Sequence, residues 1–152
     1  MDTPMTKPLP QPTPVTRPFW DGLLEQEIRI QHCRDCGAWV FYPRSHCHRC
    51  LSDQLDWRVV SGAATLYSFT ITRQPTAPFF ADEVPQRLAV VELAEGVRMT
   101  STLVGIADAD IHIGMALRPV FDPVSADITM LRFTAATPAT AAAVSHTEDR
   151  RT

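Results

Sequence analysis

Two short segments decide the fold of this chain: Cys33-Arg34-Asp35-Cys36-Gly37 and Cys47-His48-Arg49-Cys50. They hold all four of its cysteines as two C-x-x-C pairs, with ten residues between the pairs. Two such pairs can place four thiolates around one tetrahedral metal ion, and zinc is the usual occupant. A glycine after the second thiolate lets the chain turn with positive φ and keeps backbone N–H groups near the sulfurs. The pattern therefore predicts a structural zinc ion bound by Cys33, Cys36, Cys47 and Cys50.

Disulfide bonds and an iron site are the alternative interpretations of these cysteines. Disulfides need an oxidising compartment, and the segment 1–15 has no apolar stretch of the secretory type, so we expect free thiolates in the cytoplasm. Four thiolates on paired knuckles also hold iron in rubredoxin-like electron carriers. Leu51 follows the second pair where Gly37 follows the first. The matched glycine turns of a symmetric redox site are therefore missing, and zinc is favoured over iron.

The composition limits both the core and the partners. The chain has 152 residues, of which 45% are apolar, which suits one average domain or two small ones that share a core. A net charge of −3 and a pI of about 5.9 give no electrostatic case for a polyanionic partner. No apolar run approaches the length that crosses a bilayer. We expect a soluble protein that is held together in part by its metal.

Proline and alanine mark the two ends of the chain. Residues 1–16 contain five prolines and few apolar side chains, which predicts an extended, disordered arm. Residues 135–152 are rich in alanine and threonine and then become polar, which predicts a flexible tail. Between these ends we expect a helix and a zinc ribbon over residues 17–60 and a barrel over residues 61–134.

A short amphipathic helix is expected just before the first cysteine pair. Pro18 suits a first helical turn, and apolar side chains recur at helical spacing over residues 18–26. Ile28 and Ile30 then alternate with polar residues, which predicts a strand that leads toward the first knuckle. Residues 39–42 are also prone to form a strand. So small a ribbon needs its metal, because thiolate ligation supplies stability that its core cannot.

The second half of the chain changes to the two-residue period of strands. Tyr67, Phe69 and Ile71 define the first strand, and we expect these side chains to point inward. The Pro-rich loop 74–85 is long for a connection in a small barrel, and such loops are often functional. Further strands are expected at residues 88–93, 97–104, 115–121 and 128–133, with a hairpin turn at 94–96. The predicted fold is mainly β: a helix and a rubredoxin-like zinc ribbon, followed by a five-stranded OB-fold barrel of the oligonucleotide/oligosaccharide-binding type.

An ordered series of motifs resembles one known family in both halves of the chain. Besides the two cysteine pairs, the matching motifs are Phe41-Tyr42-Pro43-Arg44, Trp57, Ser61-Gly62, residues 90–98, Gly105, residues 113–115 and residues 120–121. Over about residues 17–134 the chain resembles the acyl-CoA-associated zinc-ribbon and OB-fold family, once known only as domain-of-unknown-function family 35. His48 departs from that family, which often has proline there, but both thiolates of the knuckle are present.

The resemblance implies an accessory role in acyl-CoA metabolism. Members of the family partner thiolases, sterol-carrier-type thiolases acting as aldolases, hydroxymethylglutaryl-CoA synthase, or acyltransferases related to thiolases. The non-catalytic subunit organises the hetero-oligomer and helps to hold the acyl-CoA. The resemblance thus implies a thiolase-like or sterol-carrier-type thiolase/aldolase partner. A steroid side chain, an aromatic succinyl-CoA, a short acetoacetyl unit and a polyketide acyl group are all compatible with the sequence.

Apolar side chains in two places are candidates for partner or acyl-chain contact. Trp20, Leu23 and Leu24 lie on the expected helix, and Phe79 and Phe80 lie on the Pro-rich loop. So small a domain cannot bury every group of this kind. For Leu23 and Leu24, packing across the junction of ribbon and barrel is the favoured interpretation. For Phe79 and Phe80, contact with a partner or a ligand is favoured.

Two other functions compete with the accessory role. Zinc ribbons and OB barrels also occur in proteins that bind single-stranded nucleic acid, but the arginines of this barrel are scattered along the sequence. A self-contained enzyme is the second alternative. Four cysteine ligands leave a metal no open position for water, and His46, His48 and His112 accompany no nucleophile motif. We therefore expect no catalytic residues and no activity of the chain alone.

Overall fold

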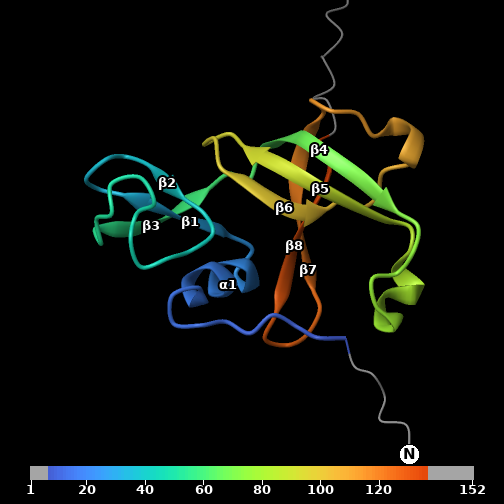
Figure 1. Cartoon of the computed structure of the whole chain (residues 1–152), viewed down its shortest axis with the longest axis horizontal. Helices are drawn as coiled ribbons and strands as arrows, with labels where there is room; N and C mark the ends of the chain where they lie inside the picture. Colours follow the sequence, from blue (N-terminus) through green and yellow to red (C-terminus); the bar gives the residue numbers. More distant parts are fainter. Residues whose placement is uncertain (1–6, 137–152) are drawn as a thin grey trace, which may run out of the picture.

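A three-stranded ribbon lies beside a five-stranded barrel in this protein (Figure 1). The structure is a computed structural model that describes residues 7–136. Within this part the chain forms one α-helix, two short 3-10 helices and eight strands. The predicted mainly β architecture of helix, zinc ribbon and nearly closed barrel is confirmed. No helix in the described range combines the length and the hydropathy that crossing a membrane requires.

Helix α1 (Arg17–Leu24) precedes the ribbon and packs beneath the junction of ribbon and barrel (Figure 1). Pro18 lies in its first turn, where a missing N–H group leaves no helical hydrogen bond unmade. The helix ends two residues earlier than residues 18–26 would predict. At Gln26 the backbone takes φ of 61°, so the chain turns away toward the first strand. Phe19 and Leu23 are buried, and they anchor the helix to the core.

The ribbon sheet has the strand order β2-β1-β3. Strands β1 (Ile28–Cys33), β2 (Trp39–Val40) and β3 (Leu55–Val60) are antiparallel neighbours, and β1 pairs with β3 along its whole length. The sequence pattern does not predict β3. Apolar residues lie on both faces of β3: Val59 is exposed, and its neighbour Val60 is buried. The sequence of β3 therefore does not alternate strictly between apolar and polar residues.

The barrel has the strand order β6-β5-β4-β7-β8. Its strands are β4 (Ala64–Thr72), β5 (Gln86–Leu93), β6 (Arg98–Thr102), β7 (Ala116–Pro123) and β8 (Thr129–Ala135). A parallel bridge between Leu103 and Phe133 brings the two outer strands together, so the sheet is nearly closed. The five strands are those the alternation predicts, with bounds that differ by up to a few residues at each end.

A β-bulge changes the orientation of side chains in the first barrel strand. The register between β4 and β5 shifts between Leu66 and Ser68. Leu66 is fully buried, whereas Tyr67 is 47% exposed. The prediction that Tyr67 points inward is therefore wrong, because one extra residue in the strand reverses the alternation. Tyr67 instead lies on the outside, with the guanidinium of Arg98 3.7 Å from its ring centroid.

Short 3-10 helices and an N-terminal stretch without regular structure lie outside the strands and helix α1. The Pro-rich loop contains the 3-10 helix η1 (Pro78–Glu83), and a second one, η2 (Asp108–Asp110), precedes β7. Residues 7–16 run without helix or strand past the β7–β8 turn (Figure 1). The disorder of the arm stays a prediction. Residues 1–6, and residues 137–152 of the predicted tail, lie outside the described residues.

One apolar core connects the ribbon to the barrel. It contains Phe19 of α1, Ile28 and Ile30 of β1, and barrel side chains such as Leu66 and Phe133. Strand β1 thus contributes to this core at its first residues and to the cysteine knuckles at its end. The ribbon and the barrel are therefore positioned relative to each other by a shared packing interface.

Candidate functional site

The two knuckles bring four sulfur atoms together at the tip of the ribbon. All four Sγ atoms lie within 4.8 Å of one another. The Sγ atoms of Cys33 and Cys50 are 3.6 Å apart, as are those of Cys36 and Cys47. A tetrahedral zinc ion with Zn–S bonds of about 2.3 Å separates its sulfurs by about 3.8 Å. The four free cysteines therefore fit a zinc ion, and their spacing is far too long for disulfides.

The backbone around the sulfurs repeats from one knuckle to the other. Gly37 N–H donates to the Cys33 carbonyl at 2.9 Å, and Leu51 N–H donates to the Cys47 carbonyl at 3.0 Å. Both residues have a left-handed backbone, with φ of 71° at Gly37 and 63° at Leu51. The interpretation that the second knuckle lacks a matched turn is therefore wrong. Leucine adopts the same turn as glycine, although its Cβ makes this conformation costly.

The thiols of Cys47 and Cys50 differ in acidity. Hydrogen bonds from the backbone N–H groups of Cys50 and Arg49 lower the pKa of Cys47 to about 7. The Ser52 N–H lowers the pKa of Cys50, but the nearby thiols, first that of Cys36, and burial outweigh it and raise that pKa to about 12. The Cys47 thiol therefore ionises more readily than the Cys50 thiol. A divalent cation favours the thiolate at every ligand, so its affinity should increase with pH.

The ligand set indicates a structural role for the metal. Four thiolates complete a tetrahedral coordination shell and leave no position for water or substrate. The second knuckle also directs backbone N–H groups toward its sulfurs, and the Arg49 N–H lies 3.4 Å from Cys47 Sγ. Such hydrogen bonds orient thiolates and lower the charge that they present. The geometry therefore places four cysteines of a small ribbon to bind one tetrahedral metal ion.

Among residues 7–136 no histidine belongs to this cluster of ligand atoms. His46 Nδ1 lies 3.0 Å from Ser45 Oγ, but both side chains are exposed, and the hydrogen bonds of the described residues include no acid that orients the ring. His48 is exposed, and His112 Nδ1 lies 3.0 Å from the Asp110 carbonyl on the surface. These surroundings do not assemble a nucleophile, a base and an orienting acid.

The predicted contact residues of helix α1 have different surroundings. Leu23 is 1% exposed and packs in the core, as favoured from the sequence. Leu24 is 43% exposed, so the interpretation of core packing is wrong for this residue, which lies about 100° further around the helix than Leu23. Trp20 is half-buried, packs edge-on against Phe19 and lines a hollow of about 300 Å³ between α1 and the barrel. Trp20 and Leu24 therefore remain available for contact, and Leu23 does not.

Phe79 and Phe80 lie on helix η1, and both are half-buried. Their rings pack edge-on, with centroids 4.8 Å apart. Phe80 lines a cavity of about 630 Å³ between η1, the barrel and the N-terminal arm, whereas Phe79 is not among the lining residues of this cavity. The structure thus separates the roles of two residues that the sequence treats as one pair.

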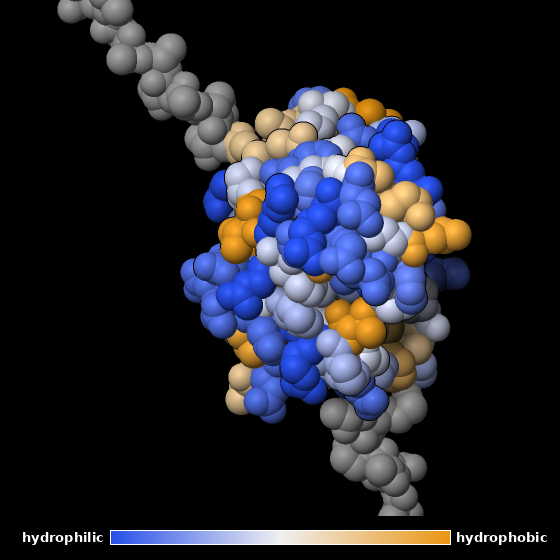
Figure 2. Space-filling view, turned by 90° about the vertical axis from the view of Figure 1, so that its left-hand side faces the viewer, coloured by the Kyte–Doolittle hydropathy of each residue, from blue (hydrophilic) through white to orange (hydrophobic). Residues whose placement is uncertain are grey.

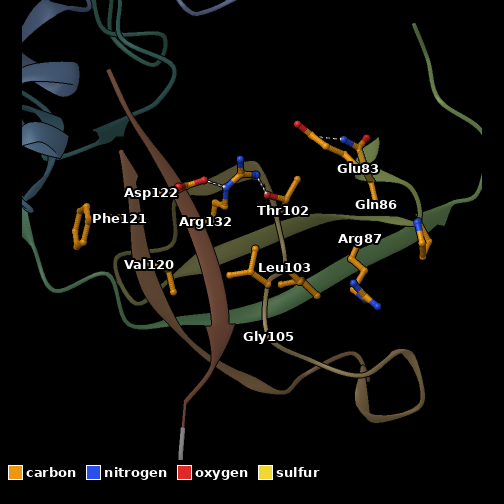
Figure 3. A pocket seen from close by; sticks show the side chains of 12 residues that line it. Glu83, Gln86, Arg87, Thr102, Leu103, Gly105, Val120, Phe121, Asp122 and Arg132 are labelled. Carbon is orange, nitrogen blue, oxygen red and sulfur yellow. Dashed lines mark hydrogen bonds and ion pairs between the residues drawn. The ribbon is translucent and has the colours of Figure 1, made fainter. Parts of the chain in front are cut away.

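A second cavity, of about 560 Å³, is drawn in Figure 3, and it shares lining residues with the first cavity. Arg132 projects between Asp122 and Thr102, with Nε 2.5 Å from Asp122 Oδ2 and Nη1 2.7 Å from Thr102 Oγ1. Neither cavity is predictable from the sequence, because the lining residues come from segments far apart in the chain. The long Pro-rich loop is the only signal that pointed to this region.

The arginines of the barrel are largely neutralised by carboxylates. Arg87 donates to Asp108 at 2.6 Å, and Arg98 donates to Glu92 at 2.6 Å. Arg132 is paired with Asp122. The face of the molecule at the ribbon end is mostly hydrophilic, with separate hydrophobic spots instead of one patch (Figure 2). The electrostatic basis of nucleic-acid binding is an unneutralised basic groove, and these pairs weaken that alternative.

Two family descriptions match the chain, one for each half. Residues 20–56 match the description "ChsH2, rubredoxin-like zinc ribbon domain", and residues 57–122 match "ChsH2, C-terminal OB-fold domain". The boundary between the two matches lies within β3, where the chain leaves the knuckles and enters the barrel.

Three relatives of known description are similar in sequence. The chain is 38% identical over 112 residues to a "Probable enoyl-CoA hydratase alpha subunit" of Thermomonospora curvata, which covers 72% of this chain and 33% of the relative. It is 37% identical over 103 residues to the "3-oxo-4,17-pregnadiene-20-carboxyl-CoA hydratase alpha subunit" of Mycobacterium tuberculosis, covering 68% and 32%. The chain thus spans about a third of the length of these two relatives. It is 30% identical over 111 residues to a "DUF35 domain-containing scaffold protein" of Methanocaldococcus jannaschii, covering 71% and 77%.

Solved structures repeat the same architecture. The "Ltp2-ChsH2(DUF35) aldolase" matches with a TM-score of 0.76 and 29% identity, over 85% of this chain and 100% of the matched chain. A DUF35 protein of Sulfolobus solfataricus matches with a TM-score of 0.58 and 17% identity, over 81% of this chain and 86% of its own, which shows the fold alone.

Proposed function

Because the chain belongs to the DUF35 family of zinc-ribbon and OB-fold proteins, we propose that it is a non-catalytic accessory subunit of a thiolase-type acyl-CoA enzyme. The partner would be a thiolase, a sterol-carrier-type thiolase acting as an aldolase, or a related acyltransferase. The observation that carries the proposal is the match to the Ltp2-ChsH2(DUF35) aldolase, which extends over the full length of the matched chain. The chain would organise the complex and help to hold the acyl-CoA.

The metal centre supports an accessory role over catalysis by this chain. Its four cysteine ligands complete the coordination of a zinc ion, so the metal has a structural task. Four free thiols also suit a reducing compartment such as the cytoplasm, which is part of the proposal. The scaffold description of the archaeal relative agrees with a role in assembly.

A partner of the hydratase class is the second candidate. The two bacterial relatives are named as alpha subunits of enoyl-CoA hydratases, and one of those names specifies a steroid-derived acyl-CoA. This chain matches only about a third of each, so the hydratase chemistry of the relatives does not transfer with the match. Thiolase-type and hydratase-type partners share an acyl-CoA substrate, so an accessory role of this chain is common to the two candidates.

The decisive experiment identifies and assays the partner. The chain is tagged in its native host, complexes are purified, and the catalytic subunit is assayed with and without this chain. We expect co-purification with a thiolase-type enzyme whose acyl-CoA turnover or stability depends on the chain. Equal activity and equal stability of the partner in both cases would contradict the proposal. A hydratase in the purified complex would select the second candidate.

The exposed side of helix α1 gives a test of the partner surface. Trp20 lines an open hollow and is partly exposed, and apolar groups of this kind anchor many protein interfaces. The Trp20→Asp variant should weaken complex formation while zinc content stays at one ion per chain. Val59→Asp, at a 60% exposed apolar position of the ribbon, is the matched control. Normal assembly of the Trp20 variant would assign the residue to packing within the chain.

A further inference from the structure

We propose that the cavity between the N-terminal arm and the barrel binds the uncharged, apolar acyl part of a thioester, and that residues 7–10 form its movable wall. The acyl class of the ligand rests on the proposed function. The cavity and its wall do not, since they follow from the geometry of this chain.

The cavity has the size and the lining of a small-molecule site. Its volume of about 630 Å³ is within the range of ligand pockets, roughly 300–1,000 Å³. Its walls come from four parts of the chain: the arm, the η1 region, the paired strands β5 and β6, and the β7–β8 turn with the start of β8. The apolar lining residues are Pro8, Leu9, Pro10, Phe80, Leu88, Val124 and Met130.

Each charged side chain at this cavity already has a partner of opposite charge. Lys7 is hydrogen-bonded to Glu83, and its ammonium lies 5.1 Å from the ring centroid of Phe80. Arg132 is bonded to Asp122 and to Thr102. A ligand with a buried charge would have to displace one of these partners. An uncharged apolar group would not, so the charge balance favours an acyl or ring-like tail over a carboxylate or a phosphate.

The wall formed by the arm is held by few interactions. Prolines at positions 8 and 10 have no N–H group to donate, and the backbone hydrogen bonds found outside helices and strands begin only at Thr13. The arm is therefore attached at this cavity by the Lys7 contacts and by apolar packing. Its prolines restrict the unbound conformations, which reduces the entropy lost when the arm closes on a ligand. Such a segment can open to admit a chain and then cover it.

The neighbouring cavity would receive the polar groups that follow the acyl tail of the ligand. The two cavities share Glu83, Gln86, Thr102 and Arg132 in their walls (Figure 3). Beyond these residues the second cavity adds polar side chains such as Arg87 and Asp122. An apolar tail in the first cavity would thus continue past Arg87 and Asp122, whose polar atoms suit the thioester and amide groups that follow an acyl chain.

The test uses S-octanoyl-N-acetylcysteamine, an uncharged thioester without the nucleotide of coenzyme A, and the zinc-loaded full chain without any partner. Binding is measured by isothermal titration calorimetry, and a diazirine analogue on the acyl tail maps the contacts by photo-cross-linking. We expect saturable binding, with cross-links at the arm, at Phe80 and at Met130. No binding by the wild-type chain, or cross-links only elsewhere, would overturn the proposal.

Matched variants separate the cavity from general effects. Val124→Trp fills the cavity and should weaken binding by about tenfold, whereas Val59→Trp, on the distant ribbon surface, should leave it unchanged. Phe80→Ala should weaken binding more than Phe79→Ala, since only Phe80 lines the cavity. Deletion of residues 1–10 should weaken binding through loss of the wall. Unchanged affinity in the deletion variant would contradict the role of the arm, and unchanged affinity in Val124→Trp would contradict the cavity.

The outcome is independent of the partner experiment. If the chain binds the probe but has no effect on any partner, the proposed cavity stands and the accessory function is refuted. If the chain stimulates a partner but does not bind the probe, the accessory function stands and the proposed binding in the cavity is refuted.

Discussion

The tip of the ribbon and the barrel are stabilised by different forces. The tip has its own small cluster of buried residues, Cys33, Val40 and Cys47, and two of these three are metal ligands. The barrel buries a large set of aliphatic and aromatic side chains, among them Leu66, Val91 and Phe133. Apolar burial drives the folding of the barrel, whereas ligand binding must supply most of the stability of the knuckles. One part of the chain therefore folds conditionally and the other does not.

Strand β1 belongs both to the part stabilised by metal binding and to the part stabilised by apolar burial. Its first residues, Ile28 and Ile30, belong to the core that includes the barrel, and its last residue is a metal ligand. Loss of the metal should thus loosen the end of β1 and leave its beginning packed. This boundary makes the comparison testable residue by residue.

The largest expected effect is the loss of the zinc ion in Cys36→Ser. A serine hydroxyl is a poor zinc ligand at neutral pH, so we expect the metal content to fall from one ion per chain to nearly none, with lower solubility. Hydrogen exchange should then become fast at residues 33–52 and stay slow in β4 to β8. Chelation of the wild-type chain should give the same pattern.

His48→Ala is the control for this experiment, because His48 is exposed and lies outside the cluster of four sulfurs. It should retain its zinc ion. A well-folded Cys36→Ser chain with free thiols and no metal would show that the ribbon does not depend on zinc, and the contrast with the barrel would disappear.

The next largest effect is expected from Phe133→Ala in the barrel. Phe133 is fully buried on β8 and lies at the bridge that closes the barrel. Truncation of a buried phenylalanine costs about 3–5 kcal/mol through lost transfer energy and the cavity left behind. Urea denaturation should report this loss, while the folded fraction keeps one zinc ion. Ile113→Ala, at a 65% exposed position, should change the free energy of unfolding by less than about 0.5 kcal/mol.

The ribbon and the barrel also differ in how much of them the sequence predicts. The metal site is predictable because its ligands are close in sequence and the chemistry of thiolates allows few alternatives. The five barrel strands are predictable from alternation, yet the face of Tyr67 is not. A bulge inserts one residue into β4, and no local signal in the sequence marks that insertion.

Other features depend on tertiary contacts that no local pattern encodes. Leu23 and Leu24 are neighbours with the same chemistry, and only the docking of α1 decides that the first is buried and the second exposed. Strand β3 forms because β1 pairs with it, although its own residues alternate poorly. Composition predicts an extended, disordered arm, but composition carries no information on the contact of Lys7 with Glu83. The two cavities could not be predicted for the same reason.

Within the ribbon, Gly37 and Leu51 occupy equivalent turns of the two knuckles. At Gly37 φ is 71°, and a Cβ atom would meet nothing within 4 Å. Gly37→Ala should therefore destabilise the ribbon by the conformational cost alone, about 1–2 kcal/mol for a left-handed residue. The measurement is the zinc dissociation constant in competition with a chelator, which should rise about tenfold. An unchanged constant would mean that the metal, and not the turn residue, determines the backbone of the knuckle.

The smallest expected effect has the opposite sign, and it comes from Leu51→Gly. Leu51 has φ of 63° and is 77% exposed, so it carries the strain of the turn with little packing in return. Glycine removes the strain, but it also increases the freedom of the unfolded chain, so we expect a net stabilisation of only about 0.5 kcal/mol. The same zinc competition assay should show a slightly lower dissociation constant. A higher constant would show that the leucine side chain stabilises the knuckle despite its exposure. Tighter zinc binding combined with weaker complex formation would instead give the strained leucine a role at the partner surface, because an exposed apolar side chain in a costly conformation then contributes to assembly and not to the fold.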